Sequence, residues 1–469
     1  MTTTLLIAAL LSGVIRTGAL AQQDTVVIAH TNDFHGYLQA DGDRSAGAAR
    51  IAATFDSLRL AHGELIVLDA GDCVSGTPVS SLFNGDPIFE VMNAMRYDAV
   101  TIGNHEFDYG WRKILDYREL VDFPLLSCNA LDPQGHRIAD RATVLLERAG
   151  LRVGVVGATT DSTPHMVSSQ GNEGIEFADQ IEAVRAAVDS LRNHCDLLIA
   201  LTHLGAREDG SLAAQVTGID LIVGGHSHDV ISPPMWVEGT PIVQAGSYGS
   251  HVGVTRVIVD DDRRVVDVIG EVIPATSMPR PNPRVAKLVD EWEAKVSTLV
   301  DVEISRTDDE WSRDEMYDFV EHVLRTCHDA DVGYYNRGGI RAAFTPGPIT
   351  KRHIWNTHPF GNRIAVVSVL GAEIGGRLKE RFADQGLPID PDRIYRVATN
   401  TFVIEEIRIA KHFGAPLHVQ IHDDLVRDVV IDDVQNYGVA DRVYSPYAPS
   451  ISDVVGDAVK AGALGGGGK

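Results

Sequence analysis

The first half of the chain alternates short apolar runs with longer segments in which apolar residues recur every three or four positions. The short runs predict strands and the helical periodicity predicts helices. The predicted strands are 25–29, 64–68, 97–102, 153–157, 196–201, 220–223, 241–244 and 251–260, and the predicted helices are 46–60, 86–95 and 179–194. Strands that alternate with helices indicate an α/β layer structure.

A break in this pattern comes at Ser277–Pro283, which carries three prolines in its last five residues and predicts a linker. Residues 285–299 then have the pattern of an amphipathic helix. Beyond residue 300 the pattern predicts helices 312–328 and 371–383, strands 363–369 and 394–399, and a glycine-rich loop at 336–341. A chain of 469 residues exceeds a single core, so we expect two domains, at 22–277 and 301–457, joined by a linker and connector helix at 278–300.

Polar side chains gather where the predicted strands of the first domain end. In α/β sheets, sites collect at the carboxyl ends of strands. An isolated Asp there is usually a turn residue, and a lone His is usually structural, but seven such residues after successive strands favour a metal site. The seven candidates are Asp33, His35, Asp72, Asn104, His203, His226 and His228.

Oxygen and imidazole donors together suit Zn²⁺, Mn²⁺, Fe or Co, whereas a thiolate site would need cysteines. Seven ligands exceed the need of one ion, but two ions that share one bridging carboxylate would use them all. Two-metal sites of this kind hold the attacking water and the leaving oxygen of a phosphoryl ester.

Composition narrows the range of partners. The formal net charge of -24 argues against a nucleic-acid polymer or an anionic membrane bound through a general basic surface. An anionic small molecule would therefore have to be bound by metal ions or by a few arginines. The hydrophobic share of 44% and charged share of 23% are those of an ordinary globular protein.

The two ends of the chain bear on its location. Residues 1–15 are mostly apolar and resemble a secretory signal, and Ala19–Ala21 fits the cleavage pattern, so 1–21 is predicted to be a signal peptide. No Lys or Arg precedes the apolar run, which leaves a buried N-terminal helix as the alternative. No other run reaches the roughly 18 apolar residues of a membrane span, and 458–469 reads as a flexible tail. We expect an exported protein, periplasmic or extracellular, without stable membrane insertion.

Four cysteines, Cys73, Cys128, Cys195 and Cys327, are widely spaced and form no C-x-x-C pair. An even number permits disulfides. Three of the four lie on or beside apolar strand patterns, which favours buried free thiols.

Five motifs of the first domain resemble the signature blocks of the secreted 5′-nucleotidase family of calcineurin-like metallophosphoesterases. They are 31–36 (TNDFHG), 71–77 (GDCVSGT), 103–108 (GNHEFD), 202–205 (THLG) and 224–228 (GGHSH). In the second domain, 336–341 (NRGGIR) and 359–362 (PFGN) resemble the family's C-terminal blocks. The resemblance implies a four-layer α/β/β/α metallophosphoesterase domain, followed by a smaller α/β substrate-binding domain.

The resemblance also implies roles for the candidate residues. Asp33, His35 and His228 would hold one divalent ion and Asn104, His203 and His226 the other, with Asp72 bridging; Zn, Mn or Co would be the metal. His105, held by Asp108, would face the phosphate, and Asp69 and Glu106 would support the cluster. Arg337 and Arg341 would bind substrate, Arg363 is a weaker candidate, and Phe360 and Asn362 would shape the loop.

The chain departs from the family pattern at the base-binding segment. Family members carry Gly-Gly-Asp-Gly after the strand that corresponds to Tyr395–Asn400, and two aromatic rings enclose their nucleobase. Here Thr401-Phe-Val-Ile follows, and Phe402, Phe413 or Tyr437 could replace a ring.

We therefore expect hydrolysis of phosphate monoesters, above all nucleoside 5′-monophosphates, by metal-activated water. The alternatives are hydrolysis of a 2′,3′-cyclic nucleotide, a sugar phosphate or a sulfur ester, or non-catalytic binding of a metal or purine. The sequence leaves the oligomeric state open.

Overall fold

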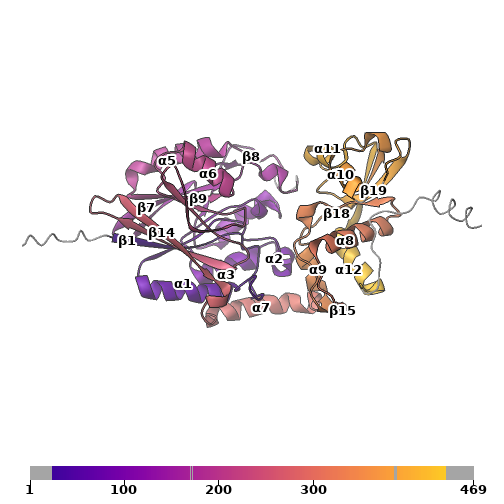
Figure 1. Ribbon diagram of the computed structural model, residues 1–469. Helices are drawn as coiled ribbons and strands as arrows, with labels where there is room; N and C mark the ends of the chain where they lie inside the picture. The colour runs from indigo at the N-terminus through magenta and orange to yellow at the C-terminus, as the bar shows by residue number, and fades with distance from the viewer. Residues whose placement is uncertain (1–23, 169–170, 172, 385–387, 440–469) are drawn as a thin grey trace, which may run out of the picture.

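The computed structural model of the chain describes residues 24–168, 171, 173–384 and 388–439 (Figure 1). The expected signal peptide and C-terminal tail lie outside this range. Two six-stranded sheets and their helices form the first unit, and a smaller four-stranded sheet with its helices forms the second (Figure 1). In the described residues no helix combines the length and the apolar character that a membrane span requires.

The first sheet has the order β14-β13-β1-β2-β3-β4, and its four strands β1 to β4 are parallel. The second has the order β11-β12-β10-β9-β7-β6, with β12, β10, β9 and β7 parallel. The strands are β1 (Asp24–Thr31), β2 (Leu65–Asp69), β3 (Ala99–Thr101), β4 (Leu125–Leu126), β6 (Thr143–Arg148), β7 (Leu151–Thr159), β9 (Leu197–His203), β10 (Leu221–Gly224), β11 (Val230–Val237), β12 (Thr240–Ala245), β13 (His251–Val259) and β14 (Val265–Pro274).

The two sheets face one another across a layer of buried aliphatic side chains, including Ile28, Leu68, Val155 and Leu201. Helices cover the outer faces of both sheets (Figure 1). These are α1 (Ala48–His62), α3 (Asp86–Met95) and α4 (Trp111–Leu120) on the first sheet, and α5 (Gln180–Leu191) and α6 (Ala206–Gln215) on the second. Parallel strands covered on both faces read as continuous apolar runs, which explains why sequence predicted them. The four-layer α/β/β/α architecture is confirmed.

Sequence missed the edge strand β11, because Pro233 and Pro234 lie within it. Proline is tolerated there because an edge strand has unpaired N–H positions.

All four cysteines are free. Cys73 and Cys195 are buried as expected, but Cys327 is exposed, so the expectation was wrong for that residue.

The second unit is built on a sheet of order β16-β19-β18-β20, together with a two-stranded β15-β17 sheet. Its elements are β15 (Glu303–Thr307), α8 (Arg313–Cys327), β16 (Val332–Gly333), β17 (Gly347–Thr350), α9 (Lys351–Thr357), β18 (Arg363–Leu370), α10 (Gly376–Asp384), β19 (Ile394–Asn400), α11 (Glu406–Phe413), β20 (His418–Leu425) and α12 (Val426–Tyr437). The predicted helix 371–383 was wrong in its first turns. Residues 371–373 form a short 3₁₀ helix, and α10 begins only at Gly376, whose left-handed φ of +56° interrupts the helical backbone.

Helix α7 (Pro283–Val300) connects the units and runs along one side of the first (Figure 1). Its buried face, including Val285 and Val296, belongs to the same core as α1 and α3. The proline-rich segment before it is held to the first unit, because the backbone N–H of Asn282 donates to the carbonyl of Ala49 (2.8 Å). The Asn282 side chain caps α7 by accepting from the N–H groups of Arg284 and Val285.

Replacing this cap should loosen the connector. We expect Asn282→Ala to lower the free energy of unfolding by about 1 kcal/mol, the typical cost of losing a helix N-cap, as measured by urea unfolding. Lys287→Ala, an exposed change on the same helix, is the control and should change stability by less than about 0.5 kcal/mol. Equal losses in the two variants would contradict a capping role.

Candidate active site

The seven predicted ligands lie together at one end of the paired sheets. Asp33 and His35 follow β1, Asp72 follows β2, and Asn104 follows β3 in the first sheet. In the second sheet, His203 is the last residue of β9, and His226 and His228 follow β10. Because these parallel strands end at the same edge, the sequence-predicted residues converge as expected.

Among the described residues, two groups with no shared member have ligand atoms that all lie within 4.8 Å of one another, Asp33 with His35 and His228, and Asp72 with His203 and His226. A third such group takes His35 and Asp72 from these two and adds His105. The Oδ1 atom of Asp33 is 3.2 Å from Nε2 of His228. The Oδ2 atom of Asp72 is 3.1 Å from Nε2 of His203 and 3.9 Å from Nε2 of His35. Asp72 therefore contacts members of both groups.

The unpaired atoms of this cluster are suited to divalent cations. Among the described residues, the buried Oδ1 of Asn104 has no hydrogen-bond partner, and Asp33 Oδ1 and His203 Nε2 have only histidine–carboxylate contacts. A buried polar atom left in this way costs roughly 1–3 kcal/mol. Carboxylate, amide and imidazole donors match the preferences of divalent metal ions, so the donor set fits such ions.

Burial and close charges perturb the titration of the cluster. Burial alone would lower the pKa of His203, but the Asp72 carboxylate outweighs it and raises this pKa to about 10. Burial would raise the pKa of Asp72, yet His203 and His105 hold it well below its usual value. His226, with weaker carboxylate contacts, has its pKa lowered by burial to about 4. Asp72 thus stays ionised although it is buried, and the neighbouring histidines compensate its charge.

Two further carboxylates hold the loops that carry the cluster. Glu106 accepts backbone hydrogen bonds from Asp72 (3.1 Å), Cys73 (2.8 Å) and Gly103 (2.6 Å). Asp69 accepts from the Thr31 hydroxyl (2.6 Å) and from the N–H of Gly71 (2.9 Å). Burial raises the pKa of both carboxyl groups to about 7. Both are therefore supporting residues, as expected from the sequence.

Backbone conformation at the cluster is unusual. Positive φ is uncommon for residues other than glycine and marks strain that surrounding contacts must hold in place. Five of the seven candidates have it: Asp33 (51°), His35 (50°), Asp72 (56°), His226 (77°) and His228 (61°).

His105 lies beside the cluster and is oriented from both sides. Its Nδ1 is 2.7 Å from Oδ2 of Asp108, which also accepts from the hydroxyl of Ser75 (2.5 Å). Its Nε2 is 3.0 Å from Nη2 of Arg341, a residue of the second unit. Burial opposes protonation, but Asp108 and Asp72 raise the pKa of His105 above its ordinary value. The pairing of His105 with Asp108 is as predicted.

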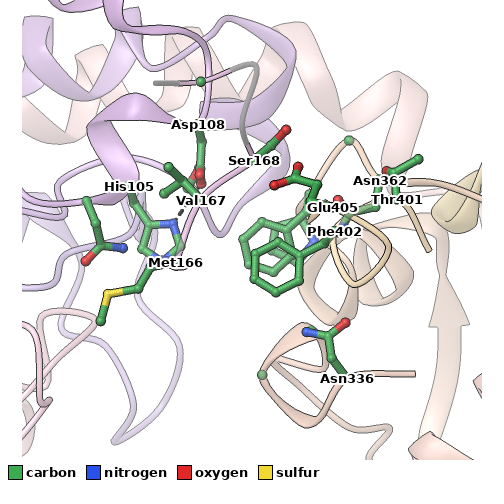
Figure 2. Close-up of a pocket in the computed structure, with 18 of the residues that line it drawn as sticks. His105, Asp108, Met166, Val167, Ser168, Asn336, Asn362, Thr401, Phe402 and Glu405 are labelled. Carbon is green, nitrogen blue, oxygen red and sulfur yellow. Dashed lines mark hydrogen bonds and ion pairs between the residues drawn. The ribbon is translucent and has the colours of Figure 1, made fainter. Parts of the chain in front are cut away.

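The cluster opens into a cavity of about 1150 Å³ between the two units. In Figure 2, His105, Asp108 and the segment Met166–Ser168 lie on one side, and Asn336, Asn362, Phe402 and Glu405 lie on the other. The cavity therefore joins the histidine and carboxylate cluster to the second unit.

The predicted arginines differ in their placement. Arg341 points to His105, whereas the Arg337 side chain is 61% exposed and is paired with Asp314 at 2.5 Å. Arg363 is also largely exposed and lies 3.6 Å from Asp423. All three arginines line the cavity, but of the three only Arg341 contacts His105.

The aromatic residues considered for base binding also differ in their positions. Phe402 lines the cavity, whereas Phe413 is fully buried in the core and Tyr437 is 71% exposed. Phe360, from which we expected only loop shaping, stacks with the His105 ring at 5.9 Å and lies 5.4 Å from the Arg341 guanidinium. Its position depends on how the two units meet, and the pattern around 359–362 offered the only signal for it.

Comparison with known proteins finds a family match in each of the two units. The sequence model of the calcineurin-like phosphoesterases matches residues 26–230, and that of the 5′-nucleotidase C-terminal domain matches residues 293–386. Protein UshA of Yersinia enterocolitica is 27% identical over 465 residues, covering 80% of this chain and 84% of that protein. Snake venom 5′-nucleotidase of Naja atra is 31% identical over 316 residues, covering 60% of this chain and 59% of that enzyme.

Solved structures share the fold. A 5′-nucleotidase precursor from Thermus thermophilus superposes with a TM-score of 0.81 at 23% identity, over 90% of this chain and 98% of that one. The sulfate thiohydrolase SoxB of Thermus thermophilus does so with a TM-score of 0.74 at 17% identity, over 91% and 98%. The two sequence models match the two units in order, and the chain therefore belongs to the calcineurin-like phosphoesterases of the 5′-nucleotidase family.

Proposed function

We propose that the protein hydrolyses phosphate monoesters with the help of two divalent metal ions, and that nucleoside 5′-monophosphates are its substrates. The main observation that supports this proposal is the position of His105. It lies between the histidine and carboxylate cluster of the first unit and Arg341 of the second. A phosphate bound there would meet both units. Relatives named 5′-nucleotidases, from Vibrio cholerae, Bos taurus and Naja atra, support the choice of substrate.

One ion would be held by Asp33, His35 and His228, and the other by Asn104, His203 and His226, with Asp72 contacting both. The two groups of close ligand atoms and the unpaired Asn104 oxygen support this division. The donor set favours Zn, Mn or Co. When bound, two such ions lower the pKa of water and neutralise charge on the phosphoryl group.

His105 and Asp108 would act on the phosphate. With Asp108 accepting from Nδ1, the other ring nitrogen of His105 lies 3.0 Å from Nη2 of Arg341, and both residues line the cavity. There it can stabilise charge on the phosphoryl oxygens or give a proton to the leaving oxygen. Arg341 would bind a phosphoryl oxygen, since a guanidinium is a strong donor to phosphate. Arg337, paired with Asp314, would have a lesser part.

The nucleobase would lie toward Phe402 and Phe360, the two phenylalanines that line the cavity from the second unit. An aromatic pair contributes about 0.5–1.5 kcal/mol beyond its buried area. Phe402 belongs to the segment that replaces Gly-Gly-Asp-Gly, so a ring is still present although the motif is absent.

We also propose that residues 22–277 form the catalytic domain and 301–457 the substrate-binding domain, joined through 278–300. The separate buried cores of the two units support this division. Export to the periplasm or outside the cell is proposed from the apolar pattern of residues 1–21, and the venom origin of one relative agrees with it.

The substrate is tested with a metal-supplemented hydrolysis panel of AMP, UMP, 2′,3′-cyclic AMP, a sugar phosphate and an aromatic phosphate without a base. We expect the highest kcat/KM for a nucleoside monophosphate, because it combines a phosphate monoester with a base that reaches the aromatic end of the cavity. The cyclic compound lacks the monoester, the sugar phosphate lacks an aromatic ring, and the aromatic phosphate lacks the ribose and base. Turnover of the cyclic or sugar compound without turnover of AMP would overturn the substrate class. No turnover of any compound with Mn²⁺ or Zn²⁺ would overturn the activity itself.

Metal binding is tested by Asp72→Asn. The wild-type protein should bind about two divalent ions per chain. The variant should bind fewer, because it loses the carboxylate that contacts both groups. Metal analysis after dialysis gives the count. Asp209→Asn is the control, since Asp209 is equally buried but lies outside both groups, and it should keep the wild-type metal content. An unchanged count in Asp72→Asn would exclude a shared ligand.

The role of His105 is tested by His105→Gln. We expect kcat to fall by roughly 10²–10⁴, the usual contribution of a positioned acid or base, with metal content and KM little changed. His251→Gln, a partly exposed histidine of β13, should retain wild-type kcat. Loss of bound metal in His105→Gln would instead make this residue a ligand, as its proximity to His35 and Asp72 allows.

A further inference from the structure

Arg408 of α11 is a buried arginine whose hydrogen bonds connect the two units. It is 4% exposed. Its Nε donates to the carbonyl of His165 (3.1 Å), and its Nη2 donates to the carbonyls of Pro164 (3.0 Å) and Val167. Two of these acceptors belong to η2 (Thr163–His165) of the first unit, and Val167 lies two residues beyond its end; we call 164–167 the η2 loop. One guanidinium thus fixes a short segment of the opposite unit.

The same guanidinium also orders its own unit. Nη1 donates to the carbonyl of Phe402 (3.2 Å) and to the carboxylate of Glu405. The guanidinium carbon lies 3.9 Å from the centre of the Phe402 ring, which is the distance of a close cation–π contact. Arg408 therefore fixes both the backbone and the ring of Phe402.

The loop that Arg408 contacts is tied to the candidate metal centre. The N–H of Thr160 donates to the carbonyl of His203 (3.0 Å), and the Thr163 hydroxyl donates to the carbonyl of Thr160 (2.6 Å). Beyond η2, Met166 and Val167 line the cavity opposite Phe402 (Figure 2). A chain of contacts thus runs from His203 through this loop and Arg408 to the Phe402 ring.

We propose that Arg408 is a positioning residue that sets the separation between Phe402 and the η2 loop, and thereby the selectivity for substrates that carry a planar base. This inference rests on the proposed function and deepens it. Arg408 acts through the ring and the loop, while the phosphate is handled at the distant end by other residues. Its removal should therefore affect the base of a substrate and spare the chemistry.

Lysine is the informative replacement, because it keeps the charge but one ammonium group cannot reproduce the planar fork that reaches four backbone carbonyls. We expect Arg408→Lys to lower kcat/KM for AMP by roughly tenfold, mainly through KM, since several hydrogen bonds are lost. For glycerol 3-phosphate, which has no ring, kcat/KM should stay within about twofold. Arg396→Lys is the matched control, because Arg396 also donates to two backbone carbonyls, of His328 and Asp329, but within the second unit.

A double-mutant cycle with Phe402→Leu separates positioning from general stability. Phe402→Leu should lower kcat/KM for AMP as much as Arg408→Lys does. The double variant should show little further loss, because both changes disturb the same contact between the Phe402 ring and the Arg408 guanidinium. The proposal would be overturned if the losses of kcat/KM in the two single variants multiplied in the double variant. Equal losses for AMP and glycerol 3-phosphate, or an unchanged kcat/KM for AMP in Arg408→Lys, would also overturn it. Failure of the proposed function would show differently, as absence of turnover in the wild-type protein.

Discussion

Buried negative charge at the ends of β1 and β2 is the constraint on which the rest of the structure depends. Asp33 and Asp72 are almost completely buried, and an isolated carboxylate in such a place would be strongly destabilising. The surrounding histidines, together with the ions that the donor set fits, supply the opposing charge. Asp72 matters most, because it contacts members of both ligand groups. The sheets must bring their strand ends together, since residues from both sheets share this charge.

The same constraint accounts for the loops around the cluster. Side chains that must converge on a small volume force the backbone into left-handed conformations, and the cost of each is of order 1–3 kcal/mol. The carboxylate of Glu106 offsets part of that cost by accepting from four backbone N–H groups of two different loops. A supporting carboxylate of this kind holds the ligands in place without contacting substrate. The strain and the supporting hydrogen bonds are therefore parts of one arrangement.

Much of the first unit could be predicted from sequence, because its parallel strands are continuous apolar runs and its candidate ligands follow them directly. The features that were missed depend on contacts between distant segments. Phe360 carries no signal of its own, and its stacking on His105 arises only when the second unit meets the first. Arg337 looked equivalent to Arg341 within one motif, yet one guanidinium faces Asp314 and the other faces His105. Periodicity fixes the face of an element, whereas such pairings are decided by how whole units pack.

The two units contribute different physical properties to the cavity. The first supplies a rigid arrangement of charge, in which most side chains are buried and hydrogen-bonded, so a substitution there affects the chemistry itself. The second supplies aromatic rings and arginines on loops and on the short helix α11. The sequence of such segments can change without disturbing the ligands of the first unit. Loss of the Gly-Gly-Asp-Gly motif is compatible with an intact cluster for this reason. Because Phe402 is held by an arginine that also holds the opposite wall, its position is determined by both units, and base selectivity becomes a property of their interface.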